Sequence, residues 1–194
     1  MFSLAGKDGA MARVYPDWDE LACLPTPINV GERQVLDCLA TLDDEWIIYV
    51  QPRLGLDQPD FIAAHPAFGI CAVEVKDWAI GAYRQDDEGR IEMRRQGGWV
   101  RTDEAPRYQA HRYRSAIHER LTALTDEAPT FTQVRGVIVM PRCTTWQAKA
   151  AITKSAMHDS ERWIDVYGYD DLQHDPTLVL TGLRQPVARQ VSAE

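Results

Sequence analysis

The chain has 194 residues and a formal net charge of −8, with 45% hydrophobic and 26% charged residues. This balance is typical of a globular protein and argues against a disordered one, and no apolar run of about 18 residues predicts a membrane span. The four cysteines form no Cys-x-x-Cys pair, which argues against a zinc ribbon and favours reduced thiols in a cytoplasmic protein. The start of the chain also lacks the pattern of a secretory signal. We therefore expect one soluble, intracellular domain.

Three segments are predicted along the chain. Residues 1–28 contain three prolines that break long elements, and we expect an irregular arm there. Residues 29–175 carry the regular patterns of the folded domain, and residues 176–194 are expected to form a C-terminal tail with a Leu/Val-rich stretch of undecided type. No repeat, low-complexity segment or Gly/Ser linker divides the chain.

Helical spacing of apolar residues predicts a first helix over Gly31–Leu42, and β-rich runs predict strands over residues 46–50, 60–64 and 70–76. Residues 82–101 alternate apolar and charged positions around turn residues and are expected to form exposed hairpins. The remaining predicted elements are a helix of about 18 residues from Pro106, a strand over 134–140, a helix over 145–157 and a strand over 163–167. This order implies an α/β sandwich around a central mixed sheet.

The charge is uneven along the chain. Residues 1–60 carry 4 basic and 11 acidic residues, whereas residues 61–120 carry 10 basic and 9 acidic residues. An acidic protein is not the usual nucleic-acid binder, but the middle third can still present a basic face. No Gly-rich phosphate loop occurs, so the chain predicts no ATPase or dinucleotide site.

One cluster of charged residues is typical of a metal-dependent catalytic site. Asp60 begins a predicted strand, and Glu74 and Lys76 end the next one, so a hairpin-like pair of strands would bring them together. Two carboxylates and an ammonium lose solvation beside a buried sheet, and a divalent cation relieves that cost. Mg²⁺ prefers oxygen ligands and keeps several waters, which suits a centre that must also bind phosphate and a nucleophilic water.

Pro59-Asp60 followed by Glu74-Val75-Lys76 resembles the motif of the PD-(D/E)xK nuclease superfamily. With Gly31-Glu32 at the start of the first helix, and Gly69, Asp77-Trp78 and Gly81 around the motif, residues 29–140 resemble the NERD (nuclease-related domain) family. The resemblance implies a restriction-endonuclease-like three-layer sandwich, with a central mixed sheet flanked by helices.

The resemblance also implies roles for individual residues. Asp60 and Glu74 would hold Mg²⁺ or Mn²⁺, Glu32 would be a further or water-mediated ligand, and Lys76 would position or activate the attacking water. Hydrolysis of DNA would leave a 5′-phosphate. The family resemblance also suggests DNA repair or processing beside a helicase, as a partner or as a fused domain. The absence of a long apolar run leads us to expect no membrane partner.

A second motif lies on the helix that begins at Pro106. Gln109 and Tyr113 are four residues apart, on one helix face, and resemble the Gln-x-x-x-Tyr signature of RecB-like exonucleases. In such enzymes this helix lines the substrate channel, so both residues are expected to support the site. The same helix carries three arginines that we expect to contact the DNA backbone: Arg107, Arg112 and Arg114.

Several alternatives remain open from the sequence. Asp57 is a rival ligand three residues before Asp60, and Glu32 has a second reading as a residue that stabilises a helix N-terminus. Trp78 and Trp99 flank the predicted hairpins. We expect them to be packing residues, with base stacking as the alternative. The sequence does not separate DNA from RNA, or endonuclease from exonuclease action. It also leaves open a catalytically silent module that binds nucleic acid or docks to a helicase.

Overall fold

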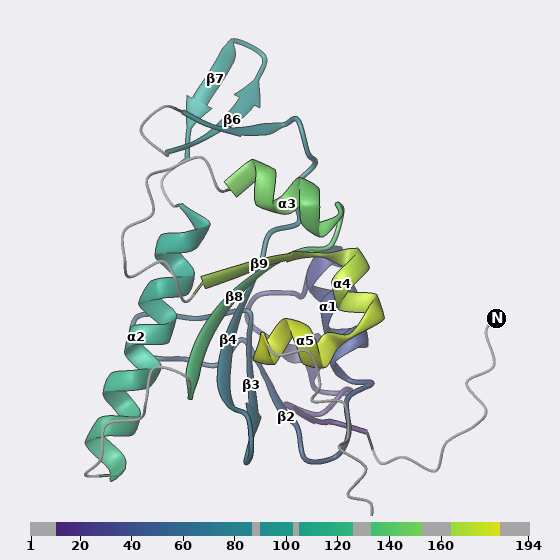
Figure 1. Cartoon of the computed structure of the whole chain (residues 1–194), viewed down its shortest axis with the longest axis vertical. Coiled ribbons are helices and arrows are strands. Elements are labelled where there is room, and N and C mark those ends of the chain that lie inside the picture. The colour runs from purple at the N-terminus through teal and green to yellow at the C-terminus, as the bar shows by residue number, and fades with distance from the viewer. Residues whose placement is uncertain (1–10, 87–89, 103–104, 126–132, 153–163, 183–194) are drawn as a thin grey trace, which may run out of the picture.

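The computed structural model describes residues 11–86, 90–102, 105–125, 133–152 and 164–182 (Figure 1). Its centre is a mixed sheet of six strands in the order β1-β2-β3-β4-β8-β9. The antiparallel pairs are β2–β3 and β3–β4, and the other neighbours are parallel. The strands are β1 (Arg13–Tyr15), β2 (Ile47–Val50), β3 (Phe61–His65), β4 (Gly69–Val75), β8 (Val134–Met140) and β9 (Ile164–Gly168).

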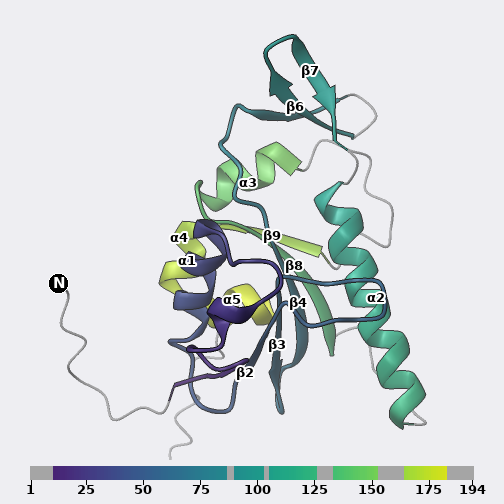
Figure 2. The same ribbon diagram turned by 180° about the vertical axis from the view of Figure 1, so that it is seen from behind.

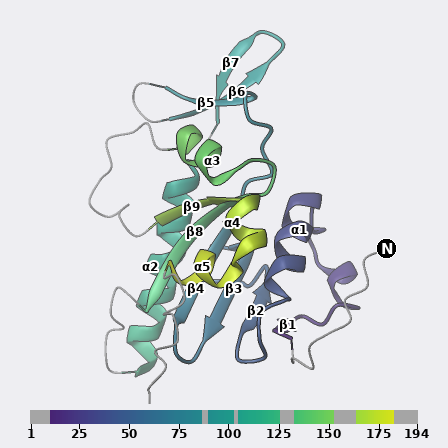
Figure 3. The same cartoon turned by 45° about the vertical axis from the view of Figure 1, so that its right-hand side comes forward.

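Helices cover both faces of this sheet. One layer contains α1 (Val30–Leu39), α4 (Tyr169–His174) and α5 (Pro176–Thr181), whose apolar residues share a core with β2, β3 and β4. The other layer contains α2 (Pro106–Thr125) and α3 (Thr145–Ile152), which pack on β8 and β9. Figures 2 and 3 show the two layers on either side of the strands. The predicted three-layer α/β sandwich is confirmed.

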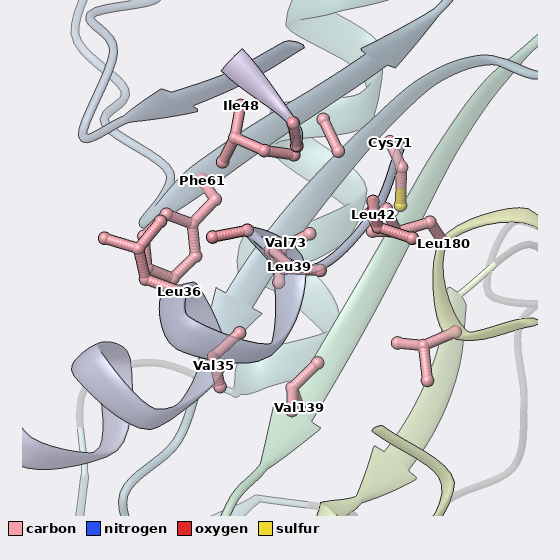
Figure 4. Packing of buried hydrophobic residues seen from close by; sticks show 14 of the residues in the cluster. Val35, Leu36, Leu39, Leu42, Ile48, Phe61, Cys71, Val73, Val139 and Leu180 are labelled. Atoms are coloured by element: carbon pink, nitrogen blue, oxygen red, sulfur yellow. The ribbon is translucent and has the colours of Figure 1, made fainter. Parts of the chain in front are cut away.

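Alternation along the strands decides which side chains face which helix layer. Phe61 and Val73 belong to the core under α1, and Figure 4 shows Leu36 of α1 next to Phe61. The intervening residues Ile62 and Ala72 pack with α2 on the other face. Successive strand residues point to opposite faces. Asp60 and Glu74, each two positions away from Ile62 or Ala72, therefore belong to the α2 side of the sheet.

A second sheet of three strands projects from this body beyond α3, as Figures 1 and 3 show. Its strands are β5 (Tyr83–Gln85), β6 (Ile91–Arg95) and β7 (Gly98–Arg101), and all neighbours are antiparallel. The exposed hairpins predicted over residues 82–101 are thus confirmed. We call this sheet the hairpin arm.

Some elements differ from the sequence predictions. The arm expected over residues 1–28 contains β1, which extends the sheet by pairing with β2, and the short helix η1 (Leu21–Cys23). The Leu/Val-rich stretch of the expected tail is α5, which begins at Pro176 after the capping residue Asp175. Residues 153–157 of the predicted helix, Trp163 and residues 183–194 lie outside the described residues. No helix in the described part of the chain is both long and apolar enough to cross a membrane.

Candidate active site

Asp60 and Glu74 meet at one end of the sheet. Phe61 of β3 pairs with Val73 of β4, so Asp60 and Glu74 occupy the next pair of positions in this antiparallel register. One carboxylate oxygen of Asp60, Oδ2, accepts a hydrogen bond of 2.6 Å from the backbone N–H of Val75. This bond fixes the Asp60 carboxylate at the end of β4, beside Glu74.

Lys76 is bound to Glu74. Its Nζ lies 2.6 Å from Glu74 Oε1, and the Glu74 side chain is buried, with 6% of its surface exposed. The same ammonium lies 5.9 Å from the centre of the Trp78 ring. A charged group with so little solvent depends on such a partner, because an unpaired buried charge is expensive. The structure therefore brings together the three residues Asp60, Glu74 and Lys76.

The environment of Asp60 opposes its negative charge. Burial, followed by repulsion from Glu74, raises the pKa of Asp60 from 3.8 to about 8. The Val75 N–H and Lys76 work in the other direction, and the nearby charge of Glu32 raises the pKa further. Without a cation, this environment favours the protonated form of Asp60.

Glu32 occupies the third position of α1 and closes its first turn. Its backbone N–H donates to Asn29 Oδ1 over 2.9 Å, and its own Oε2 accepts the Asn29 N–H over 3.2 Å. This capping box matches the reading of Glu32 as a helix N-terminal residue. Burial raises the pKa of Glu32, and the bonds from Asn29 lower it. The electrostatic coupling to Asp60 also places Glu32 close to the carboxylate pair.

Gln51 is a site residue that the sequence analysis missed. Its backbone N–H donates to the carbonyl of Asp60 over 2.8 Å, and its side chain forms a hydrogen bond with the Glu32 carboxylate. Its φ of 48° lies in the left-handed region, which costs a non-glycine residue of the order of 1 kcal/mol. Gln51 Oε1 is buried and has no hydrogen-bond partner among the described residues. No motif in the sequence marks this residue.

The start of α1 is packed directly against the segment that follows Lys76. A Cβ added to Gly31 would lie 2.7 Å from the Cβ of Asp77, so only glycine allows this approach. Asp77 forms an ion pair with Arg142, with 2.8 Å between Oδ2 and Nη2. These contacts connect α1, the end of β4 and the end of β8, and they determine where Glu32 lies.

The two residues of the Gln-x-x-x-Tyr motif lie on α2. Tyr113 is buried, with 5% exposure, and packs with Ile62 and Ala72 on the sheet face to which Glu74 belongs. Gln109 lies one helical turn earlier, and its Oε1 is buried without a hydrogen-bond partner in the described part of the chain. Tyr113 is therefore a core residue by its packing, while Gln109 carries an unused polar oxygen.

The predicted basic face of α2 is not exposed at Arg107 and Arg114. Arg107 is 7% exposed and donates from Nη1 to the carbonyl of Ile164 over 3.1 Å. Arg114 is 4% exposed and donates from Nε to the carbonyl of Val134 over 2.8 Å. Burial also lowers the pKa of Arg114. Both arginines connect α2 to the neighbouring strands, so the expectation that they contact DNA is corrected.

Arg112 and Asp57 form an ion pair, with 2.5 Å between Nε and Oδ1. This pair connects α2 to the loop before β3. Asp57, the alternative metal ligand, therefore has a structural partner in Arg112 and needs no role beside Asp60 to explain its charge. The same ion pair engages the third arginine that was expected to contact DNA.

A different group of potential ligands lies at the other end of β3. In the described part of the chain, ligand atoms of Asp43, Glu45 and His65 lie within 4.8 Å of one another, whereas Glu32, Asp60 and Glu74 form no group that tight. His65 Nδ1 accepts the backbone N–H of Ala67 over 3.0 Å, so a neutral His65 carries its proton on Nε2. Nε2 lies 3.6 Å from Glu45 Oε2, and a nitrogen that carries a proton has no lone pair free for a metal ion.

The donors around Asp60 fit a hard divalent cation. Asp60 and Glu74 offer oxygen ligands in a desolvated place with an excess of negative charge, and Gln51 adds a buried oxygen that lacks a partner. Glu32, Asp60 and Glu74 form no tight group among the described residues, and such spacing suits contact through waters, because Mg²⁺ usually retains several of them. Asp60 and Glu74, with Gln51 and Glu32 beside them, are therefore the residues that could hold such a cation.

Comparison with known proteins agrees with this geometry. The family model of the nuclease-related domain (NERD) matches residues 29–141, which include α1, β2–β4 and α2. Neither the curated proteins nor the solved structures compared with the chain include a significant match. The matched segment contains every residue of the Asp60–Glu74–Lys76 cluster, together with Glu32, Gln109 and Tyr113.

Proposed function

Because the chain belongs to the nuclease-related domain family, we propose that it is a metal-dependent deoxyribonuclease whose active site is the Asp60–Glu74–Lys76 cluster. The observation that carries the proposal is the pairing of two desolvated carboxylates across β3 and β4, with an ammonium bonded to one of them. This arrangement supplies what phosphodiester hydrolysis needs: oxygen ligands for a cation, and a positive charge beside the reacting phosphate.

Asp60 and Glu74 would hold Mg²⁺ or Mn²⁺, with Glu32 as a contact through water. When bound, the cation would supply Lewis acidity toward a phosphate oxygen and acidify a bound water. Lys76 would place its ammonium against the negative charge that grows on the attacked phosphate, and would hold the attacking water by hydrogen bonding. Its bond to Glu74 keeps the ammonium at that position.

Gln109 and Tyr113 would support the site from α2. The unpartnered Gln109 oxygen is available to accept a hydrogen bond from a water or from the substrate. Tyr113 would act through packing, since it is buried against Ile62 and Ala72. Attack of water on phosphorus with departure of the 3′ oxygen would leave a 5′-phosphate. DNA repair or processing beside a helicase belongs to the proposal through the family resemblance.

The test is a cleavage time course on end-labelled single-stranded and double-stranded DNA at low salt. Parallel reactions would contain Mg²⁺, Mn²⁺ or EDTA, and would compare the wild type with Glu74→Ala and with Asp44→Ala, which removes an exposed carboxylate elsewhere. We expect cleavage in Mg²⁺ or Mn²⁺ by the wild type and Asp44→Ala only. Retained cleavage by folded Glu74→Ala would contradict the proposal, and an RNA substrate would separate ribonuclease from deoxyribonuclease activity.

One observation favours a second candidate, a catalytically silent nucleic-acid-binding or docking module. Each carboxylate of the pair already has a partner within the protein, since Asp60 accepts the Val75 N–H and Glu74 accepts Lys76. Calorimetric titration with Mg²⁺ and Mn²⁺ distinguishes the two functions. Binding by the wild type that is lost in Asp60→Ala supports the nuclease. Absence of metal binding and cleavage, with DNA binding intact, supports the module.

A further inference from the structure

The two faces of the hairpin arm differ in chemistry. In the paired register, Glu92 lies opposite Arg84 and Arg101, and Arg94 lies opposite Trp99, so these five residues share one face. The other face contains the buried Ile91 and, two residues further along β6, Met93, which pairs with Tyr83. The Ile91 end of that face is therefore directed to the body, while its other end leaves Arg95 and Val100 exposed. The opposite face presents three arginines around a tryptophan. We call this opposite face the arginine face.

Two of the three arginines of this face, Arg94 and Arg101, are exposed. Arg84 is engaged within the face, since its Nε lies 2.7 Å from Glu92 and its guanidinium carbon 4.4 Å from the centre of the Trp99 ring. Arg94 and Arg101 are exposed and form no ion pair with any other described residue. Glu92 is already bound by Arg84, so the charge of Arg94 and Arg101 is not offset within the face.

This positive surface stands in contrast to the rest of the molecule. The chain as a whole has a formal charge of −8, and Arg107 and Arg114 of α2 are buried. On the arginine face itself, three arginines stand against the single acidic residue Glu92. Asp86 of the β5–β6 turn is bound by Arg90, while Asp87 and Glu88 lie outside the described residues.

The base of the hairpin arm is connected to the candidate active site. Tyr83 of β5 stacks on Trp78, with ring centres 4.2 Å apart and planes 10° apart. Trp78 follows Lys76 by two residues, and the Lys76 ammonium lies near the Trp78 ring. The base of the hairpin arm therefore lies beside the Lys76 end of the candidate active site.

We propose that the arginine face of the hairpin arm binds the phosphate backbone of the DNA substrate through Arg94 and Arg101. This inference rests on the proposed nuclease function for its choice of ligand. Guanidinium groups bind phosphate oxygens through paired hydrogen bonds, and backbone contacts position nucleic acid without selecting its sequence. The contact with the DNA backbone that the sequence suggested for the arginines of α2 is thus placed on the hairpin arm.

The test measures binding without cleavage. Fluorescence anisotropy would follow labelled single-stranded and double-stranded DNA in EDTA at several salt concentrations, with the full chain. The variant Arg94→Gln/Arg101→Gln would be compared with Arg13→Gln/Arg120→Gln, which removes the same charge from exposed positions on β1 and α2. Circular dichroism melting would establish that both variants are folded.

We expect the arm variant to raise the Kd by about tenfold or more at low salt, because two phosphate contacts are lost. The slope of log K against log salt should become shallower by about 1.8 for duplex and about 1.4 for single-stranded DNA, while the control variant stays near the wild type. Equal weakening by both variants, an unchanged arm variant, or no binding by the wild type would overturn the inference. Since the assay contains no metal, loss of binding in the arm variant supports the inference even if the wild type cleaves no DNA.

Discussion

The carboxylate of Asp60 accepts a 2.6 Å hydrogen bond from the backbone N–H of Val75, the residue that separates Glu74 from Lys76. This bond connects the first residue of the motif to the strand that carries the other two. It stabilises the ionised form of Asp60, yet burial and the repulsion from Glu74 outweigh it, and the pKa rises to about 8. The site is therefore built for a positive charge that the protein alone does not supply in full.

The raised pKa of Asp60 predicts a stability that depends on pH. In the metal-free protein the folded state holds a proton on Asp60 that the unfolded chain releases above its ordinary pKa of 3.8. The resulting stabilisation is fully present below pH 3.8 and is lost as the pH rises toward 8. In EDTA, the melting temperature of Asp60→Asn should thus fall less between pH 5 and pH 8 than that of the wild type. The control Asp44→Asn should follow the wild type, and parallel curves for all three proteins would contradict the assigned pKa.

The Glu74–Lys76 pair predicts a non-additive effect on stability. Lys76→Met leaves the buried Glu74 without its ammonium, and we expect a loss of about 3 kcal/mol in the free energy of unfolding. The double variant Glu74→Gln/Lys76→Met removes both charges and should recover much of this loss. Urea unfolding in EDTA at neutral pH measures the cycle. Additive effects of the two single changes would show that the pair is not coupled in the folded protein.

Replacing Gly31 by alanine should lower the stability of the protein, against the usual effect of this substitution in a helix. Gly→Ala inside a helix usually stabilises by up to about 1 kcal/mol, but here the new Cβ would collide with Asp77. We expect Gly31→Ala to destabilise the protein by about 1–3 kcal/mol through strain and displacement of Asp77. Gly97→Ala, where no atom lies within 4 Å of the added Cβ, is the matched control and should change stability little. A stabilised Gly31→Ala protein would contradict the packing of α1 on the Asp77 segment.

Arg114 is predicted to act on stability and not on DNA binding. Arg114→Met removes the bond to the Val134 carbonyl inside the protein, which should cost about 1–3 kcal/mol of unfolding free energy. Since Arg114 is buried, the salt dependence of DNA binding should remain that of the wild type. Urea unfolding and the anisotropy assay would be performed on the same protein samples. A shallower salt slope in Arg114→Met would restore this arginine as a phosphate contact.

Much of the fold follows from local patterns. Apolar runs predicted the central strands to within one or two residues, because buried strands have few polar positions and turns with Gly or Pro separate them. The meeting of Asp60 and Glu74 followed from two adjacent strands joined by a short turn. The family resemblance stated from these residues agrees with the match over residues 29–141.

The remaining parts depend on contacts that a linear pattern does not contain. Arg107 and Arg114 look like a solvated helix face, but they lie where α2 crosses carbonyls of β8 and β9. Gln51 has no local signal, because its place beside Glu32 arises from the packing of α1 on the sheet. The basic surface of the hairpin arm was missed because its arginines alternate with apolar residues, and only the strand register assigns them to one face.

The most direct measurement of the central claim is the cleavage rate of Lys76→Ala on end-labelled DNA in Mg²⁺, with the wild type beside it. The Lys76 side chain is more exposed than that of Glu74, at 16% against 6%, and removing it leaves both carboxylates in place. We predict that the wild type cleaves and that folded Lys76→Ala is slower by at least about 100-fold, because the positive charge beside the reacting phosphate is lost. Equal rates for the two proteins would contradict the assignment of the active site.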